Sequence, residues 1–273
     1  MTGGDRSTLV IAGAGDVGGR LAHLRAARGD DVLALRRRPT DADAGVRPVR
    51  ADLTSGAGLL SLPRHADALV FCAAPDRRDE AAYRALFVDG LRRVLDRVQA
   101  TRVLLLSSTA VYAEDAGERV DEDTPVRPPA FNGRVLREAE CELAGERGAS
   151  VVRLTGLYGP GRDALLRRAR AGTPGRPHWS NRIHVDDAAA ALSHLLDLPE
   201  PQPLYLGSDA LPTLDSEVLA WVRAREGLPP VAASPAPESG RRVSSARLRA
   251  SGWAPRYPDY RSGYADLLAS TGP

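Results

Sequence analysis

A doubly wound α/β fold, in which helices cover both faces of a parallel sheet, is the architecture that this sequence predicts. Short apolar runs alternate along the chain with segments whose apolar residues recur every three or four positions. These two patterns are typical of buried parallel strands and of amphipathic helices. Strands that alternate with helices form right-handed βαβ units, and such units build a doubly wound sheet.

The expected elements follow these two patterns in order. The apolar runs predict strands at 9–12, 31–35, 46–49, 68–74, 102–106 and 151–154. The helical spacing predicts helices from about 17, at 79–98 and at 163–171. The last third is less regular, and predicts a strand at 204–206, helices at 214–225, 244–251 and 260–269, and a proline-rich connector at 228–238.

The domain organisation follows from length and from this change in pattern. A chain of 273 residues accommodates one large α/β domain or a domain with a smaller lobe. We expect a first domain at 1–156, to which residues 181–200 return. A smaller C-terminal lobe would comprise 157–180 and 201–273.

A Gly-x-Gly-x-x-Gly pattern follows the first apolar run. In a dinucleotide site the first glycine allows a sharp turn, the second lets the backbone approach the pyrophosphate, and the third lets the helix pack on the sheet. The pyrophosphate would lie on the N–H groups at the start of that helix. An ordinary glycine-rich turn is the alternative, because the chain holds 26 glycines. The predicted Rossmann-type loop comprises Gly13, Ala14, Gly15, Asp16, Val17 and Gly18.

A basic turn follows the second expected strand, where Arg36 and Arg37 precede Arg38 and Pro39. An acidic residue here would hydrogen-bond the adenosine ribose of NAD, whereas arginine accommodates the 2′-phosphate of NADP. Guanidinium groups make paired hydrogen bonds to phosphate oxygens. We therefore expect NADP(H) in preference to NAD(H), with Arg36 and Arg37 as ligands. The alternative is that these arginines only keep a surface turn soluble.

The charge composition argues against nucleic acid or a membrane surface as the main partner. The 37 basic and 35 acidic residues nearly cancel and are interspersed along the chain. No N-terminal segment resembles a signal peptide, and no run approaches the roughly 18 apolar residues of a membrane span. We therefore expect a cytoplasmic protein.

Cysteine, histidine and lysine usage limits the chemistry further. Cys72 and Cys141 stand far apart without a Cys-x-x-Cys motif, so we expect two small buried thiols rather than a disulfide. The five histidines show no metal-ligand spacing, and no metal is expected. The chain contains no lysine, so all 37 basic residues are arginine and no step can use a lysine amine.

Several short motifs are specific in their combination, order and spacing. They are the glycine loop, Asp52-Leu53, Ser107 to Tyr112, Arg153 to Arg162 and Asn181 to Asp187. With these motifs the sequence resembles the extended branch of the short-chain dehydrogenase/reductase superfamily, the NAD(P)-dependent epimerase/dehydratase-like proteins. The resemblance implies a lobe that closes over a small-molecule substrate, and a homodimer that pairs through the helices near 79–98 and 130–147.

The resemblance also implies cofactor contacts beyond the glycine loop. Asp52 and Leu53 would border the adenine. Ala73 and Ala74 would lie beside the cofactor, and Leu157 near the nicotinamide.

The sequence departs from the family at its catalytic pair. The family normally carries Tyr-x-x-x-Lys on the helix after the fifth strand, where lysine lowers the pKa of the catalytic tyrosine. Aligned on neighbouring landmarks, the tyrosine position is Asn132 and the lysine position is Leu136. Asn132 cannot transfer a proton, so the proton must come from water, the substrate or another side chain.

Two residues near the end of the fifth strand are candidates for this chemistry. Ser108 occupies the family's catalytic Ser/Thr position, and Tyr112 is a candidate proton donor. The alternative for Tyr112 is a packed ring with its hydroxyl hydrogen-bonded to backbone. We expect an atypical oxidoreductase or isomerase that acts on a small organic molecule with NADP(H). The alternative is a non-catalytic NADP-binding sensor or scaffold.

Overall fold

The computed structural model describes residues 6–39, 45–144 and 148–270. The chain divides into two compact units. Unit 1 comprises Met1–Tyr112, Val126–Arg153 and Ala189–Tyr205, and unit 2 comprises Ala113–Pro125, Leu154–Ala188 and Leu206–Pro273. The predicted first domain therefore differs from unit 1 chiefly at 113–125, which belongs to unit 2.

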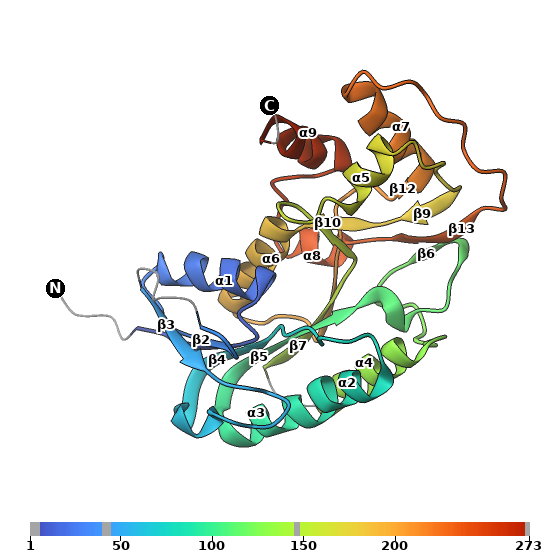
Figure 1. The fold of residues 1–273 in the computed structure, drawn as a ribbon. Coiled ribbons are helices and arrows are strands. Elements are labelled where there is room, and N and C mark those ends of the chain that lie inside the picture. The colour runs from blue at the N-terminus through green and yellow to red at the C-terminus, as the bar shows by residue number, and fades with distance from the viewer. Residues whose placement is uncertain (1–5, 40–44, 145–147, 271–273) are drawn as a thin grey trace. The chain divides into compact units, whose positions relative to one another are not determined.

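The principal sheet has seven strands. They are β1 (Thr8–Ala12), β2 (Asp31–Arg36), β3 (Val46–Arg50), β4 (His65–Phe71), β5 (Gln99–Ser108), β7 (Ala149–Leu154) and β11 (Leu204–Gly207). Their order is β11-β7-β5-β4-β1-β2-β3 (Figure 1). The pairs β1–β2, β1–β4, β2–β3 and β4–β5 are parallel. This is the order of a doubly wound sheet, so the predicted Rossmann-type α/β architecture is confirmed.

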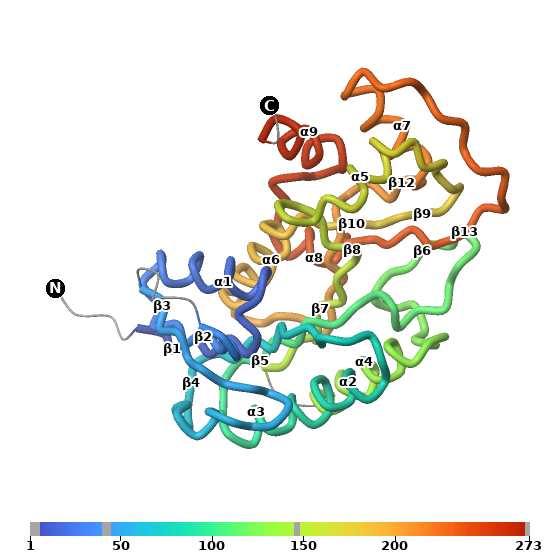
Figure 2. The backbone as a smooth tube through the Cα atoms, viewed as in Figure 1, coloured from blue at the N-terminus to red at the C-terminus, as the bar shows by residue number. Residues whose placement is uncertain are grey.

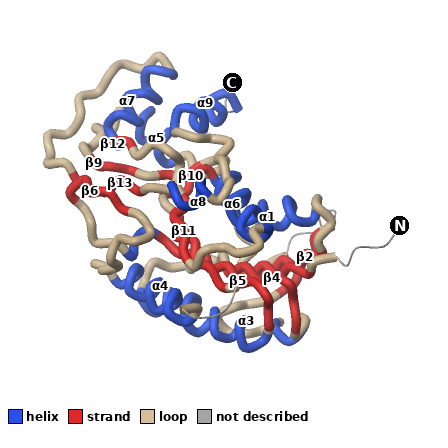
Figure 3. Tube along the Cα trace, turned by 180° about the vertical axis from the view of Figure 1, so that it is seen from behind, coloured by secondary structure: helices blue, strands red, loops and turns tan. Residues whose placement is uncertain are grey.

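Helices lie on both faces of this sheet. Helix α1 (Asp16–Ala26) and the C-terminal part of α6 (Val185–Asp197) lie on one face (Figures 1 and 3). The other face is covered by α2 (Glu80–Arg84), α3 (Leu91–Arg97) and α4 (Phe131–Glu142). The central strands are therefore shielded on both sides, and the side chains of Val10, Ile11 and Leu104 are fully buried. Figure 2 traces the first β1–α1–β2 unit.

The helix predicted at 79–98 forms with an irregular middle. Asp79 accepts a hydrogen bond from the backbone N–H of Ala82 at 2.8 Å and so caps α2. A π-helical segment at Ala85–Gly90 then joins α2 to α3. A Cβ at Gly90 would lie 3.0 Å from the carbonyl oxygen of Leu53, so glycine permits close packing at the end of this segment. The spacing of apolar residues alone does not reveal a π-helical segment.

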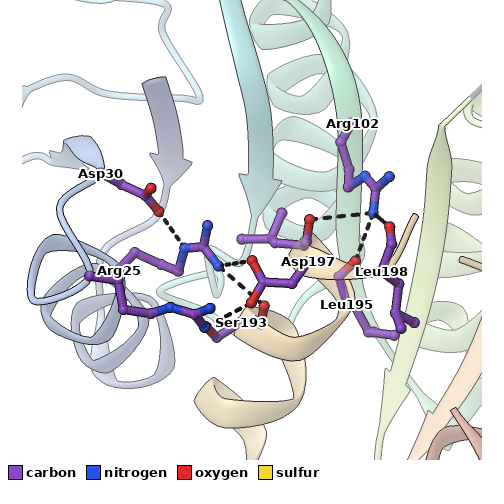
Figure 4. Close-up of polar contacts among 9 residues, drawn as sticks. Arg25, Asp30, Arg102, Ser193, Leu195, Asp197 and Leu198 are labelled. Atoms are coloured by element: carbon purple, nitrogen blue, oxygen red, sulfur yellow. Dashed lines mark hydrogen bonds and ion pairs between the residues drawn. The ribbon is translucent and has the colours of Figure 1, made fainter. Parts of the chain in front are cut away.

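Two arginines hold the C-terminus of α6 against the amino ends of the strands (Figure 4). Arg25, on α1, donates to a carboxylate oxygen of Asp197 at 2.6 Å and also pairs with Asp30. Arg102, at the start of β5, donates to the carbonyl oxygens of Leu195, at 3.0 Å, and Leu198. Cations near helix C-termini are favourable because the last carbonyls lack helical partners. These contacts therefore anchor the C-terminus of α6 at the amino ends of the strands.

Unit 2 contains a second, four-stranded sheet. Its strands are β12 (Thr213–Leu214), β9 (His178–Ser180), β13 (Ser239–Val243) and β6 (Ala116–Val120), in that order. A separate parallel pair is formed by β8 (Gly156–Tyr158) and β10 (Arg182–His184). Helices α5 (Ala164–Arg170), α7 (Asp215–Arg225) and α9 (Tyr260–Ser270) surround an apolar core, and α8 (Ala246–Ala250) follows β13.

Three details differ from the sequence-based expectations. The fourth strand ends at Phe71, so Cys72, Ala73 and Ala74 lie in the loop beyond it rather than in the strand. Cys141 is an exposed free thiol, although both cysteines were expected to be buried. The predicted helix at 130–147 ends at Glu142, and residues 145–147 lie outside the described part of the chain. Across the described residues, no helix has the length and apolar character needed to traverse a membrane.

Candidate functional site

The glycine loop after β1 requires glycine at its first and third positions. Gly13 has φ +99°, and a Cβ there would lie 2.4 Å from the Cα of Ala73. A Cβ at Gly18 would lie 2.4 Å from the carbonyl oxygen of Gly13 and 2.7 Å from the Sγ of Cys72. The first glycine therefore makes the turn and the third brings α1 onto the sheet, as predicted from their spacing.

Gly15, the second glycine of the loop, is open where Gly13 and Gly18 are crowded. Its φ is −72°, and a Cβ placed on it would find no described atom within 4 Å. Gly15 precedes the first turn of α1, where no side-chain cap is present among the described residues. The loop is therefore open where a pyrophosphate would approach, and a helix N-terminus carries the partial positive charge that a phosphate requires. The residues present fit a dinucleotide.

The remaining loop residues divide between the core and the surface. Ala14 and Val17 are buried. Ala14 donates its backbone N–H to the carbonyl oxygen of Leu35 at 2.9 Å, which ties the loop to the end of β2. Asp16 is exposed and pairs with Arg20 at 3.1 Å on the surface of α1.

Arg36, the last residue of β2, and Arg37, which follows it, have different partners. Arg36 donates through Nε to the carbonyl oxygen of Ala14, and through Nη2 to that of Gly15 at 3.2 Å. Arg37 forms a paired ion bridge with Asp76, in which Nη2 donates to Oδ1 at 2.6 Å. One guanidinium therefore lies against the glycine loop, and the other lies near the carboxyl end of β4.

The residues expected near the adenine lie after β3 and β4. The Oδ1 of Asp52 accepts the hydroxyl of Thr54 at 2.7 Å and its backbone N–H at 2.9 Å. These hydrogen bonds lower the pKa of Asp52 despite the opposing effect of burial. Leu53 is buried, Ala73 is half-buried beside Gly13, and Ala74 is exposed.

Ser108 and Asn132 come from neighbouring elements of unit 1. Ser108 ends β5, and its Oγ accepts the backbone N–H of Ala110 at 3.2 Å. Asn132 lies in the first turn of α4 and is half-buried. A Cβ at Gly133 would lie 2.3 Å from the carbonyl oxygen of Ala110, so this glycine brings α4 against the residues that follow Ser108.

Tyr112 belongs to a buried network. Its side chain is fully buried, and its hydroxyl accepts a hydrogen bond from Nη1 of Arg153 at 2.7 Å. The other nitrogens of Arg153 donate to both carboxylate oxygens of Glu140 at 2.9 and 2.7 Å, and Ser107 donates to Glu140 at 2.6 Å. This geometry favours the packed-ring alternative for Tyr112 over proton donation, with an arginine among the partners of its hydroxyl.

Sequence reasoning missed this network although a signal was present. Glu140 follows Leu136 and precedes Leu143 on the apolar face of α4, and Arg153 interrupts the apolar run of β7. The side chains of Glu140 and Arg153 are 1% and 3% exposed. Burial opposes the charge of Arg153, but its bonds to Glu140 outweigh this and raise the pKa of Arg153. A charge at an apolar position predicts a buried partner of opposite sign.

The cofactor and site residues expected beyond Arg153 lie in unit 2. Leu157 is half-buried on β8, where it pairs with Ile183 of β10. His178 lies in β9, and its Nδ1 is 2.9 Å from the Oγ of Ser239. His184 is buried, and its ring centroid lies 4.2 Å from that of Tyr257. His184 is therefore part of the packing of unit 2.

Unit 2 also buries a carboxylate that the sequence did not single out. Asp209 is 1% exposed, and its Oδ1 accepts the backbone N–H of Leu211 at 3.2 Å. Its Oδ2 has no hydrogen-bond partner among the described residues. Burial raises the pKa of Asp209 to about 7, with smaller contributions from Asp259 and Asp187, while Arg182 lowers it.

Replacing Asp209 by asparagine is expected to stabilise the protein at alkaline pH. The pKa of Asp209 is about 7 in the folded protein and about 4 in the unfolded chain. Folding therefore favours the protonated carboxyl, and the stability that this provides is fully present below pH 4 and is lost as the pH rises through 7. At pH 8 the variant should gain about 2–4 kcal/mol in the free energy of unfolding. Urea titrations at pH 5 and pH 8 measure this difference. An equal change in the free energy of unfolding at pH 5 and pH 8 would show that ionisation of Asp209 does not destabilise the folded protein.

The geometry of unit 1 defines a dinucleotide-binding α/β protein. It has a doubly wound sheet, a tight glycine loop after β1 and an open helix N-terminus at Gly15. The model of the NAD dependent epimerase/dehydratase family matches residues 8–205. The chain belongs to this family, and it contains no lysine.

Individual relatives agree with this assignment. Protein YeeZ of Escherichia coli K12 is 31% identical over 210 residues, which cover 72% of this chain and 76% of YeeZ. A candidate NAD-dependent epimerase/dehydratase from Methylobacillus flagellatus is similar in structure, with a TM-score of 0.86, 37% identity, and coverage of 97% and 99% of the two chains. The human epimerase family protein SDR39U1, solved with NADPH, shares the fold at a TM-score of 0.75 and 21% identity, over 96% of this chain and 99% of that chain.

Across the described residues, no group of three or more metal-binding side chains is present. Cys72 has no ligand character either, because burial raises the pKa of its thiol to about 12. The Sγ of Cys72 donates to the carbonyl oxygen of Gly13 at 3.2 Å, beneath the glycine loop. Cys72 is therefore part of the loop's packing.

Proposed function

We propose that this protein binds NADP(H) and acts as an oxidoreductase or isomerase on a small organic molecule, without a Tyr–Lys pair. The open cradle at Gly15 is the observation that carries the proposal. Family membership supports a nicotinamide cofactor, and the basic pair Arg36 and Arg37 after β2 supports the phosphorylated form. Asp52, Leu53, Ala73 and Ala74 would border the adenosine half of the cofactor.

The chain's own residues suggest how the substrate is held. Bound NADPH supplies a hydride at C4 of its nicotinamide, and reduction of a carbonyl then requires one proton on the carbonyl oxygen. Because Ser108 Oγ accepts its bond from Ala110 N–H, its own hydrogen remains to be donated to such an oxygen. Asn132 can donate a second hydrogen bond but cannot transfer a proton. Water is therefore the proposed proton source.

A non-catalytic NADP-binding sensor or scaffold is the second candidate. The buried bond between Tyr112 and Arg153 favours it, because that hydroxyl is held within a structural network. Neither Ser108 nor Asn132 is an acid or base at neutral pH. The two candidates differ in one observable, since only the enzyme oxidises NADPH repeatedly in the presence of a substrate.

Titration with NADPH and NADH, followed by a screen of carbonyl and enone compounds, tests the proposal. We expect NADPH to bind at least about tenfold more tightly than NADH, because a guanidinium–phosphate contact is charge-assisted. With a substrate found, Ser108→Ala should lower kcat and leave the Kd of NADPH unchanged. Failure to bind either nucleotide, or tighter binding of NADH, contradicts the cofactor assignment. Binding without turnover favours the sensor.

A further inference from the structure

A surface ion pair links the ends of two strands beside the glycine loop. Arg37 directly follows β2, whereas Asp76 lies in the loop after β4. Both Nη atoms of Arg37 donate to the carboxylate of Asp76, one of them at 2.6 Å. The two side chains are 58% and 62% exposed. The pair is therefore bidentate in geometry and accessible to solvent.

In this pair, Asp76 binds the guanidinium of Arg37 that the proposed cofactor would use. Arg36 already donates to the carbonyl oxygens of Ala14 and Gly15. Of the two predicted phosphate ligands, Arg37 is thus the one whose described partner a ligand could replace. A phosphate monoester has the same acceptor geometry as a carboxylate, and the two compete for one guanidinium fork.

The electrostatics favour an exchangeable contact. The hydrogen bond to Arg37 lowers the pKa of Asp76, so this carboxyl stays ionised at neutral pH. The same bond raises the pKa of Arg37, and the negative charge of Asp52 adds to this at longer range. Exposed ion pairs contribute little to stability, so a ligand can displace Asp76 without disturbing the fold. A bound 2′-phosphate would, however, lie near the released carboxylate and be repelled by it.

We propose that Asp76 is a built-in competitor of the 2′-phosphate for Arg37, and so sets the preference between NADP(H) and NAD(H). This inference rests on the proposed NADP(H) function. Asp76 weakens binding of the phosphorylated coenzyme, because its contact with Arg37 must be broken first. NADH carries no phosphate at this position and leaves the pair intact. Asp76 therefore reduces a preference that Arg37 creates.

The test is a comparison of Asp76→Asn with the wild-type protein in NADPH and NADH titrations. We expect Asp76→Asn to bind NADPH about two- to five-fold more tightly and NADH equally well. Addition of Arg37→Gln should remove the gain for NADPH. Asp163→Asn is the matched control, because Asp163 is an exposed aspartate paired with an arginine in unit 2, with a side chain 54% exposed. This control should change neither affinity.

The outcomes separate this inference from the proposed function. Unchanged NADPH affinity in Asp76→Asn, with both coenzymes binding the wild type, overturns the competition alone. Weaker NADH binding overturns it too, because Asp76 would then accept a hydrogen bond from the ribose hydroxyls. If the wild type binds neither coenzyme, the proposed function and this inference both fail. Thermal melting of each variant checks that the fold is intact.

Discussion

Replacement of Gly15 by valine is expected to abolish dinucleotide binding and to leave the fold intact. Gly15 lies outside the left-handed region, with φ −72° and ψ −139°, and no described atom lies within 4 Å of a Cβ placed there. A valine side chain would therefore project into the space that the pyrophosphate needs. Displacement of the phosphates by a methyl group should weaken NADPH and NADH alike by about 100-fold or more. Calorimetric titration measures the affinities, and a melting curve measures stability.

Gly19→Ala is the matched control for this prediction. A Cβ at Gly19 would lie 3.5 Å from Nη2 of Arg36 and 3.6 Å from the carbonyl oxygen of Ala14, which are ordinary contacts. Alanine also favours the helical conformation of α1 more than glycine does, by about 1 kcal/mol. This variant should bind both coenzymes normally and be no less stable. Normal NADPH binding by Gly15→Val would mean that this loop is not the pyrophosphate site.

The parts of the site that could be predicted from sequence follow local rules. The turn at Gly13 and the packing at Gly18 depend on conformations and clashes that only glycine accommodates, so their spacing identifies them. The central strands of the parallel sheet, such as β1 and β2, are buried on both faces and appear as continuous apolar runs, whereas the edge strand β3 is largely exposed. Strand ends are less certain, because the run at 68–74 continues past the last ladder pair, at Phe71.

The parts that could not be predicted depend on partners distant in sequence. Arg37 and Asp76 are separated by 39 positions, and no local pattern connects them. The guanidinium of Arg36 lies on the glycine-loop carbonyls, which only the fold brings within reach, and its contact with a phosphate stays a prediction. The π-helical segment between α2 and α3 ends at Gly90, where a Cβ would lie 3.0 Å from the carbonyl oxygen of Leu53, a residue distant in sequence. In each case the sequence shows which side chain is present, but its partner is set by contacts between segments that are distant in sequence.

The largest effect on stability is expected from the buried pair of Glu140 and Arg153. Glu140→Gln would leave the guanidinium of Arg153 buried without a countercharge, and only the hydroxyl of Tyr112 and the new amide would remain as partners. Removal of one member of a buried ion pair costs about 3–5 kcal/mol in the free energy of unfolding. Because small domains have a net stability of about 5–15 kcal/mol, this loss is large but measurable by urea unfolding.

Glu138→Gln provides the comparison, since Glu138 lies on the same helix and pairs with Arg84 of α2. Its carboxylate accepts two hydrogen bonds at 2.8 Å, as many as Glu140 accepts from Arg153, but the side chains are 40% and 47% exposed. Its loss should cost less than about 1 kcal/mol. Charge change, helix and partner type are shared, so the difference between the two variants reports desolvation together with the hydrogen bond that Glu140 also accepts from Ser107. Equal losses would imply that water reaches Arg153, and Tyr112 would then regain its candidacy as a proton donor.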